Sequence, residues 1–175
     1  MSREFLAHHK KGLIAAAVLM IIITAAAVLI SLFSSAYLVL YNSDTGLRYI
    51  TEKAEDGLMF SVEFIHSVNQ TPVKDTYVIE NGQIKAYSTT YRSFGAGVQT
   101  ALQEGQTMTY DENGNMVITG FDIAYDPLRY IVGTVSDHIL CFDGKEISLR
   151  DMCGRNAKVV FEIVTPFEIL TKGLL

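Results

Sequence analysis

Residues 13–33 read LIAAAVLMIIITAAAVLISLF and carry no charged side chain. They lie within a longer uncharged run from Gly12 to Ser43. An α-helix rises about 1.5 Å per residue, so roughly 20 apolar residues cross a hydrocarbon core of about 30 Å. A helix also pairs its own backbone groups, as a segment surrounded by lipid requires. The run therefore predicts one transmembrane helix that separates a short tail from a long domain.

The charges of the tail predict how this helix is oriented. Positions 1–12 contain three basic residues and one acidic residue, and basic residues close to an apolar helix favour the cytoplasmic side. We therefore expect residues 1–12 to form a cytoplasmic tail and residues 13–41 to form the transmembrane helix with an interfacial exit. Residues 44–175 should form an extracytoplasmic β domain. The chain is thus predicted to be a single-pass protein of the cell membrane.

A cleaved signal peptide is the alternative interpretation of this helix. The residues Ser34–Ala36 are small, as the cleavage site of a secretory signal requires. The apolar run is longer than the usual signal-peptide core of about 7–15 residues, which favours an uncleaved anchor. With an uncleaved anchor, Tyr37 and Tyr41 suit the outer membrane–water interface, where amphipathic aromatic rings settle.

The composition argues against nucleic-acid binding. The whole chain has a formal net charge of −5. Beyond the tail there are 11 basic and 18 acidic residues, a net charge of −7. Such a surface repels phosphate backbones. The 132 residues from Asp44 onward are enough for one hydrophobic core without a metal or a disulfide.

The domain shows alternating apolar and polar residues. From Leu58 to Phe64 the apolar side chains occupy every second position, which predicts a half-buried strand. Hairpins are predicted where Asn-Gly or Asp-Gly separates two such runs, because these residues tolerate the positive φ of a tight turn. The three predicted turns are at Asn81-Gly82, Asn113-Gly114 and Asp143-Gly144.

Other segments complete the prediction of the fold. Further strand candidates are Leu47–Lys53, Tyr130–Val135 and Lys158–Thr165, and no stretch beyond residue 44 shows a sustained helical period. Short strands with regularly spaced turns are typical of all-β folds. The sequence therefore predicts a mainly β domain, an antiparallel β-sandwich or a small β-barrel of about eight or nine strands.

His66 and Ser67 are the pair that most resembles catalytic machinery. If a strand continues through them, their side chains face opposite sides and cannot share a proton. The G-x-S-x-G pattern of a nucleophile elbow is also absent from the sequence. We therefore expect no catalytic residues. The alternative is a hydrolase-like enzyme at the cell surface that uses His66 with Asp75 or Asp137.

The candidates for metal ligands are weak. They are His66, Asp75, His138 and Cys141. Two of them, His138 and Cys141, are three positions apart and would face opposite sides of a strand. Neither C-x-x-C nor H-E-x-x-H occurs in the sequence. We expect neither a metal site nor a cofactor.

Both cysteines, Cys141 and Cys153, fall in the predicted extracytoplasmic domain. An oxidising compartment would permit a disulfide that closes a loop of about a dozen residues. Two separate small core residues are an equal alternative, since free cysteine is commonly buried. Sequence spacing does not fix the geometry that a disulfide needs.

The segment Phe94–Gly97 reads FGAG, and its glycines permit left-handed backbone and close approach. It lacks the spacing of a dinucleotide-binding loop, so we interpret it as a turn. We expect it to lie near His66, close to the rigid Thr71-Pro72 turn, in the loops where β domains usually bind. A structural role for His66 is the competing interpretation. The candidate binding residues are His66, Ser67, Thr71, Pro72, Gly95 and Gly97.

Three segments together resemble a known family. They are IHSVNQTPVKD (residues 65–75), SFGAG (residues 93–97) and ILCFDGKEISL (residues 139–149). The chain from Phe60 to Leu149 is similar to the bacterial and archaeal family called domain of unknown function 1850 (DUF1850). Its members are small, often begin with an apolar segment, and are commonly encoded beside tripartite ATP-independent periplasmic (TRAP) transporters of the TAXI type. The family offers no catalytic residues to carry over.

The resemblance implies an accessory role in solute uptake. We expect a non-enzymatic, membrane-anchored protein that contacts the lipid bilayer. Its protein partners would be the membrane subunits of a TAXI-type TRAP transporter or the solute-binding protein. Besides the enzyme, a stand-alone envelope module that binds a ligand without contacting a transporter is the alternative that the residues leave open.

Overall fold

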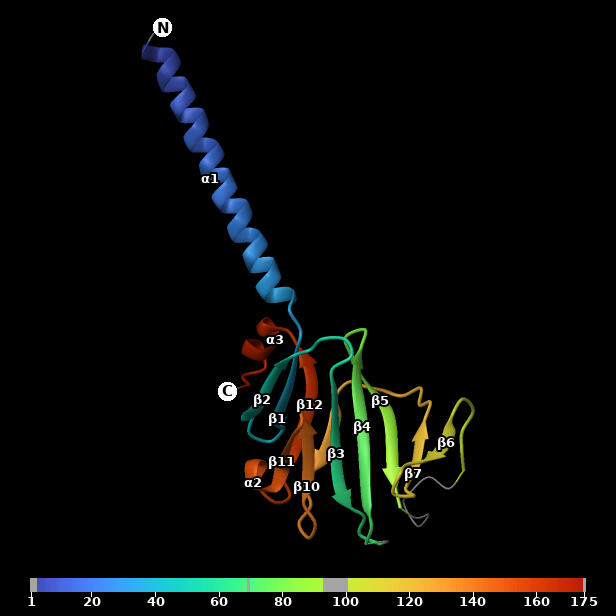
Figure 1. The fold of residues 1–175 in the computed structure, drawn as a ribbon. Coiled ribbons are helices and arrows are strands. Elements are labelled where there is room, and N and C mark those ends of the chain that lie inside the picture. The colour runs from blue at the N-terminus through green and yellow to red at the C-terminus, as the bar shows by residue number, and fades with distance from the viewer. Residues whose placement is uncertain (1–2, 69, 93–100, 175) are drawn as a thin grey trace.

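The computed structural model describes residues 3–68, 70–92 and 101–174, and it joins one long helix to a β domain (Figure 1). The long helix is α1 (Arg3–Ser34), and the domain contains two short helices, α2 (Leu149–Cys153) and α3 (Pro166–Thr171). The strands along the described chain are β1 (Tyr37–Asn42), β2 (Arg48–Lys53), β3 (Met59–Ile65), β4 (Pro72–Glu80), β5 (Gln83–Tyr91), β6 (Thr107–Tyr110), β7 (Met116–Thr119), β8 (Ala124–Tyr125), β9 (Leu128–Ile131), β10 (His138–Phe142), β11 (Lys145–Ser148) and β12 (Lys158–Val164).

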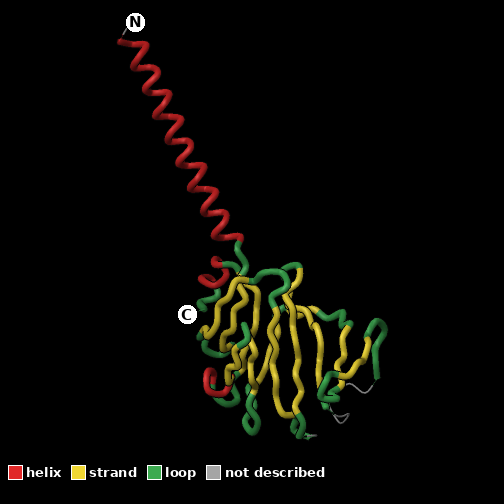
Figure 2. The backbone as a smooth tube through the Cα atoms, viewed as in Figure 1, coloured by secondary structure: helices red, strands yellow, loops and turns green. Residues whose placement is uncertain are grey.

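Helix α1 extends away from the domain as one continuous rod (Figure 2). Its segment Lys11–Ile30 spans 20 residues with a mean hydropathy of 3.0, and none of that segment is buried against the domain. This length and composition suffice to cross a membrane. The helix is therefore compatible with a membrane anchor, and an N-terminal signal sequence has the same features.

The strands form two antiparallel sheets. The smaller sheet has the order β2-β1-β12-β9, and the larger has the order β11-β10-β3-β4-β5-β7-β6 with β8 paired to β5. The prediction of a mainly β, antiparallel domain is confirmed, and neither sheet closes into a barrel. The described chain forms twelve strands, more than the about eight or nine predicted, and β1 and β8 are among those that the sequence did not predict.

The three predicted hairpins are present as β4–β5, β6–β7 and β10–β11. Their turns place Gly82, Gly114 and Gly144 at φ angles of 69°, 76° and 69°. This is the left-handed region, which glycine enters without the steric cost of a Cβ atom. The turn residues thus set the register of each hairpin, as the sequence predicted.

The core lies between the two sheets. Phe60 of β3 stacks on Phe161 of β12 across the interface, with ring centroids 5.0 Å apart, and on Tyr77 of β4 at 5.2 Å. All three side chains are buried. The inner faces of both sheets contribute to this one cluster, so the domain is a sandwich of two packed sheets.

Strand β1 is a correction to the predicted domain boundary. The sequence assigned residues 13–41 to the helix and an interfacial exit, but the structure pairs β1 with both β2 and β12. Leu38 and Leu40 enter the core between the sheets, while Val39 packs on the opposite face against Val164 and Leu174. A strand buried on both faces has no polar alternation. Its residues therefore continue the uncharged run of the helix, with only Ser34, Ser35 and Ala36 between the last apolar helix residue and the strand.

Tyr41 illustrates this correction. It was predicted to sit at the membrane–water interface, but its hydroxyl donates a hydrogen bond to Glu162 on β12, 2.9 Å away. Burial, together with the Glu162 carboxylate, raises the pKa of Tyr41 to about 12. Tyr41 therefore joins two strands of the smaller sheet.

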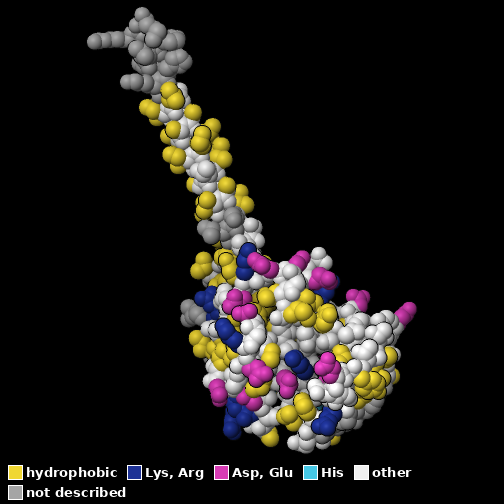
Figure 3. Space-filling model, in the orientation of Figure 1, with side chains coloured by type: hydrophobic (Ala, Val, Ile, Leu, Met, Phe, Trp, Pro, Cys, Tyr) yellow, Lys and Arg dark blue, Asp and Glu magenta, His cyan; other side chains and the backbone are white. Residues whose placement is uncertain are grey.

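Helix α3 lies beside the point where α1 enters the domain. Phe33 of α1 contacts Phe167 of α3, with ring centroids 6.2 Å apart. Phe167 and Leu170 are 58% and 75% exposed, and Figure 3 shows hydrophobic side chains continuing from α1 onto this end of the domain. With five and six residues, α2 and α3 are too short to show a helical period in the sequence.

The two cysteines, for which the sequence left a disulfide open, are free in the structure. On β10, Leu140 is fully buried in the core between the sheets. The next residue, Cys141, must point to the opposite face of the sheet because side chains alternate along a strand. Cys153 packs against the core cluster that contains Leu140. The sheet therefore separates the two sulfur atoms.

Candidate functional site

Four of the predicted binding residues lie together in the turn that joins β3 to β4. The backbone N–H of His66 donates to the carbonyl of Thr71 at 2.9 Å, and the N–H of Val68 donates to Nδ1 of His66 at 3.3 Å. Ser67 is exposed and Pro72 begins β4. The turn lies at the end of the domain farthest from α1 (Figure 1). The predicted partners Gly95 and Gly97 lie outside the described residues.

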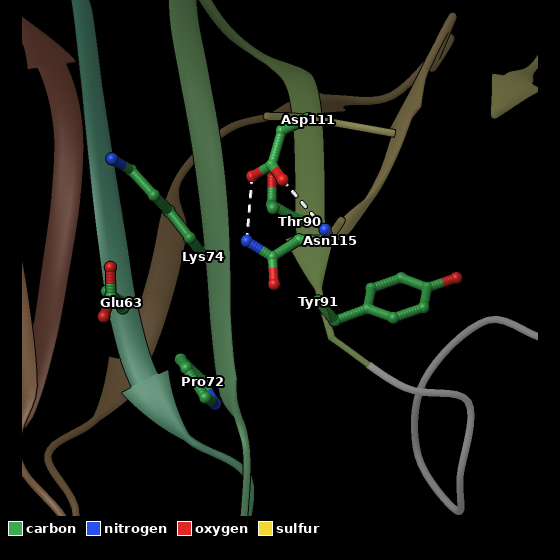
Figure 4. A pocket seen from close by; sticks show the side chains of 7 residues that line it. All are labelled: Glu63, Pro72, Lys74, Thr90, Tyr91, Asp111 and Asn115. Atoms are coloured by element: carbon green, nitrogen blue, oxygen red, sulfur yellow. Dashed lines mark hydrogen bonds between the residues drawn. The ribbon is translucent and has the colours of Figure 1, made fainter. Parts of the chain in front are cut away.

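Pro72 also lines a hollow on the larger sheet, with a volume of about 210 Å³ (Figure 4). Glu63 and Lys74 line the hollow on one side, and Asp111 and Asn115 also line it. Asp111 accepts hydrogen bonds from the backbone N–H and the side-chain amide of Asn115, both at 2.8 Å. These bonds, led by the one from the Asn115 side chain, hold the pKa of Asp111 below its usual value. Asp111 therefore stabilises the β6–β7 turn.

A second cavity, of about 160 Å³, contains a mostly buried carboxylate, that of Asp75. On β4 the inward positions are Val73, Asp75, Tyr77 and Ile79, because side chains two apart share a face. Asp75 therefore occupies a position where the pattern would place an apolar residue. Its neighbours in the cavity wall include Tyr77, Thr89, Phe121 and Tyr125.

Hydroxyl groups satisfy the Asp75 carboxylate. Thr89 on β5 donates its hydroxyl to Oδ1 of Asp75 at 2.6 Å. The Tyr130 side chain, from the opposite sheet, lies near Asp75 and acts to lower its pKa, and the Tyr130 and Tyr77 hydroxyl oxygens are 2.5 Å apart. Either hydroxyl can be the donor in this pair. We call these four residues the Asp75 network: Asp75, Thr89, Tyr130 and Tyr77.

Burial sets the protonation of the network. Burial raises the pKa of Asp75, and the hydroxyls of Thr89 and Tyr130 oppose that rise. Burial likewise raises the pKa of Tyr77, Tyr125 and Tyr130, and the nearby Asp75 charge adds to the rise for each. The tyrosines therefore remain neutral at physiological pH, so Asp75 is surrounded by neutral hydroxyls.

No cation neutralises Asp75 among the described residues. The ion pairs of that part of the chain use Glu55, Glu80, Asp44 and Glu162 as their carboxylates. Lys74 precedes Asp75 on β4 and lines the hollow of Figure 4. A mostly buried carboxylate without a cationic neighbour is costly for a fold to retain.

His138 extends the network on the side of β10. Its ring stacks on Phe64 at 5.0 Å and meets the Tyr130 ring edge-on at 5.8 Å. Nδ1 of His138 accepts from the backbone N–H of Gly133 at 3.1 Å. Burial lowers the pKa of His138, which keeps the ring neutral. Among the described residues no group of three or more His, Cys, Asp or Glu side chains could hold a metal ion.

Asp137 has a structural position beside this histidine. It accepts from the Ser148 hydroxyl at 2.5 Å and from the backbone N–H of Arg150 at 3.0 Å, at the start of α2. Although burial opposes the effect, these hydrogen bonds hold the pKa of Asp137 below its usual value. Asp75 and Asp137, the two carboxylates considered as partners for His66, thus have hydrogen bonds of their own.

The substitution Asp75→Asn should raise the melting temperature at pH 7. The folded pKa of Asp75 lies above its usual value of 3.8, so the wild-type domain loses stability as pH rises through the folded pKa. Asparagine carries no charge and avoids this loss, and we expect a gain of a few degrees, equivalent to about 1 kcal/mol. Thermal denaturation from pH 4 to pH 8 would measure it.

The gain should shrink as the pH falls, because Asp75 then binds its proton. The matched control is Asp143→Asn, in the exposed β10–β11 turn, which should leave the pH dependence unchanged. A melting temperature below that of the wild type at pH 7 would contradict the assignment of Asp75 as a buried, uncompensated charge.

The sequence suggests Asp75 as a partner of His66 but does not reveal this cavity. A signal was present: Val73, Tyr77 and Ile79 share one face of a strand, and Asp75 is in phase with them. Tyr125 and Tyr130 come from distant strands, and only the packing of the two sheets brings them to Asp75. Sequence periodicity contains no information on that packing.

The comparisons with known proteins give one match. The family model described as "Domain of unknown function (DUF1850)" matches residues 60–149. The matched segment runs from β3 to β11 and includes the whole Asp75 network. No curated protein and no solved structure matches the chain.

Proposed function

This chain belongs to the DUF1850 family, and from that premise we propose that it is a non-enzymatic, membrane-anchored accessory protein of a TAXI-type TRAP transporter. In this role α1 remains in the membrane and the sandwich lies on the extracytoplasmic side. The sandwich would assist solute uptake by contacting the membrane subunits or the solute-binding protein. The link to this transporter class comes from the family resemblance.

The observation that carries the proposal is the short connection between helix and sandwich. Helix α1 ends at Ser34 and β1 begins at Tyr37, so only Ser35 and Ala36 join them. Strand β1 is an inner strand of the smaller sheet. An anchor joined by so short a connection to an inner strand keeps the domain at the membrane surface, where the subunits of a transporter are within reach.

The surface next to α1 supports this arrangement. Phe33, Phe167 and Leu170 are exposed apolar side chains at the junction of α1 and α3. With α1 in a bilayer, this end of the domain faces the lipid headgroups, where aromatic side chains are favoured. The bilayer would thereby restrict the tilt of the sandwich.

Topology gives the first expected result. Protease added to intact spheroplasts should digest the domain and spare the N-terminal tail, because the basic residues Arg3, Lys10 and Lys11 favour the cytoplasm. Immunoblots with an N-terminal and a C-terminal tag would show which part is protected. Protection of the domain until lysis would contradict the orientation, and a mature protein beginning at Tyr37 would contradict the anchor.

The functional test compares tethered and free domains. In a strain lacking this gene, uptake of the solute of the cognate transporter should fall several-fold, and the full chain should restore it. Residues 37–175 exported behind a cleavable signal should restore much less, as should a chain with a long Gly/Ser insertion between Ser35 and Ala36. Unchanged uptake after deletion would overturn the proposal, and full rescue by the free domain would overturn the role of the tether.

A further inference from the structure

We propose that the cavity beside Asp75 is a binding site for a small organic cation, namely an ammonium group bearing short alkyl substituents. The site is distinct from the predicted His66 turn and from the transporter contacts proposed above. The charge, the walls and the size of the cavity support the proposal. Its test does not depend on a transporter.

The charge of the site selects a cation. Asp75 is mostly buried; it accepts a hydrogen bond from the neutral hydroxyl of Thr89, and the neutral Tyr130 lies nearby. A carboxylate that leaves water without a countercharge costs free energy, and a bound cation restores that energy. The net charge of −7 on the chain beyond the tail also raises the local concentration of cations.

The walls of the site suit an alkylated ammonium group. Tyr77 and Tyr125 both line the cavity, with ring centroids 5.7 Å apart and ring planes at 82°, and Phe121 adds a third aromatic side chain. Aromatic rings attract cations through their electron-rich faces, and such cages recognise methylated ammonium groups. Hydroxyls of Ser88 and Thr89 at the wall can accept hydrogen bonds from a substituted ammonium.

The size of the site limits its ligand. The cavity measures about 160 Å³, whereas pockets for drug-sized ligands measure about 300–1,000 Å³. A water molecule accounts for about 30 Å³ of liquid, so the space suits a head group of a few heavy atoms. The site therefore fits a small amine, or the ammonium end of a larger molecule.

The test measures binding to the full-length chain in detergent. Isothermal titration calorimetry with methylammonium, tetramethylammonium and choline chlorides should give saturable binding to one site for at least one of them. Sodium chloride is the ionic-strength control and tert-butanol is the neutral probe of similar shape, and neither should bind. Binding should weaken on acidification, because Asp75 is the ionised group at the cavity and its neighbours Tyr77, Tyr125 and Tyr130 are neutral.

Variants locate the site. Asp75→Asn should lower the affinity for the cation at least about tenfold, while the melting temperature stays at or above that of the wild type. Tyr125→Leu should lower the affinity severalfold, because it removes one aromatic ring from the cavity wall. Glu63→Gln, in the hollow of Figure 4, is the matched carboxylate control and should bind normally. Absence of binding for all three cations, equal binding of tert-butanol, or unchanged affinity in Asp75→Asn would each overturn the proposal.

Discussion

A chain that begins at Asp44 should fail to fold, whereas a chain that begins at Tyr37 should form a stable β domain. The shorter chain lacks β1, which lies between β2 and β12 in the smaller sheet. Leu38, Val39 and Leu40 on β1 are at most 2% exposed. Burying each such side chain contributes about 1.5–3 kcal/mol, and domains are stable by only about 5–15 kcal/mol in total.

The loss extends beyond these three side chains. Without β1, strand β2 has no partner in the described sheet and β12 keeps only β9, so the backbone groups of both strands lose hydrogen bonds. Far-UV circular dichroism and thermal denaturation of residues 37–175 and 44–175 would compare the two chains. Cooperative melting of residues 44–175 at a temperature near that of residues 37–175 would contradict the central position of β1.

The substitution Gly133→Ala should destabilise the domain by about 3 kcal/mol or more. A Cβ atom at Gly133 would lie 2.1 Å from the carbonyl oxygen of Ser136, which is backbone and cannot rotate away. The preceding residue, Val132, is fully buried and hydrogen-bonds to Ala157 through its backbone. Neither the backbone at Gly133 nor the Ser136 carbonyl can move away without disturbing packed structure. Overpacking of this kind destabilises proteins.

The same substitution should disturb the Asp75 network. The backbone N–H of Gly133 donates to His138, and the His138 ring lies against Tyr130. We expect a fall of roughly 10 °C or more in melting temperature. The control is Ser136→Ala, which removes one exposed hydrogen bond to Ile65 and should change the melting temperature by only a few degrees. Wild-type stability of Gly133→Ala would show that the loop is looser than described.

The larger sheet was predictable because its signals are local. Asn-Gly and Asp-Gly turns identify each hairpin within about ten residues of sequence, and period-two alternation assigns the inner face. The predicted turns at Asn113-Gly114 and Asp143-Gly144 accordingly join β6 to β7 and β10 to β11. Here the residues that decide the structure are adjacent in the chain.

Strand β1 and the Asp75 cavity depend on contacts between distant residues. The residues YLVLYN of β1 follow an apolar helix without a charged break, so composition cannot separate a membrane-spanning segment from a strand buried on both faces. The hydroxyl groups of Tyr77 and Tyr130 are hydrogen-bonded although the two residues are 53 positions apart in the chain. The sequence shows that Asp75 is polar and in phase with core residues, and only the packed sheets show what surrounds it.

The most direct test of the proposed function is the identity of the protein's partners in the membrane. The tagged full chain would be purified from membranes solubilised in mild detergent, after brief chemical crosslinking, and analysed by quantitative mass spectrometry. The control is the same α1 segment joined to an unrelated soluble domain, which retains the anchor and removes the sandwich. We predict strong enrichment of TAXI-type TRAP membrane subunits or of the solute-binding protein with the full chain. Equal recovery of these proteins with the control, or their absence from both samples, would contradict the proposal.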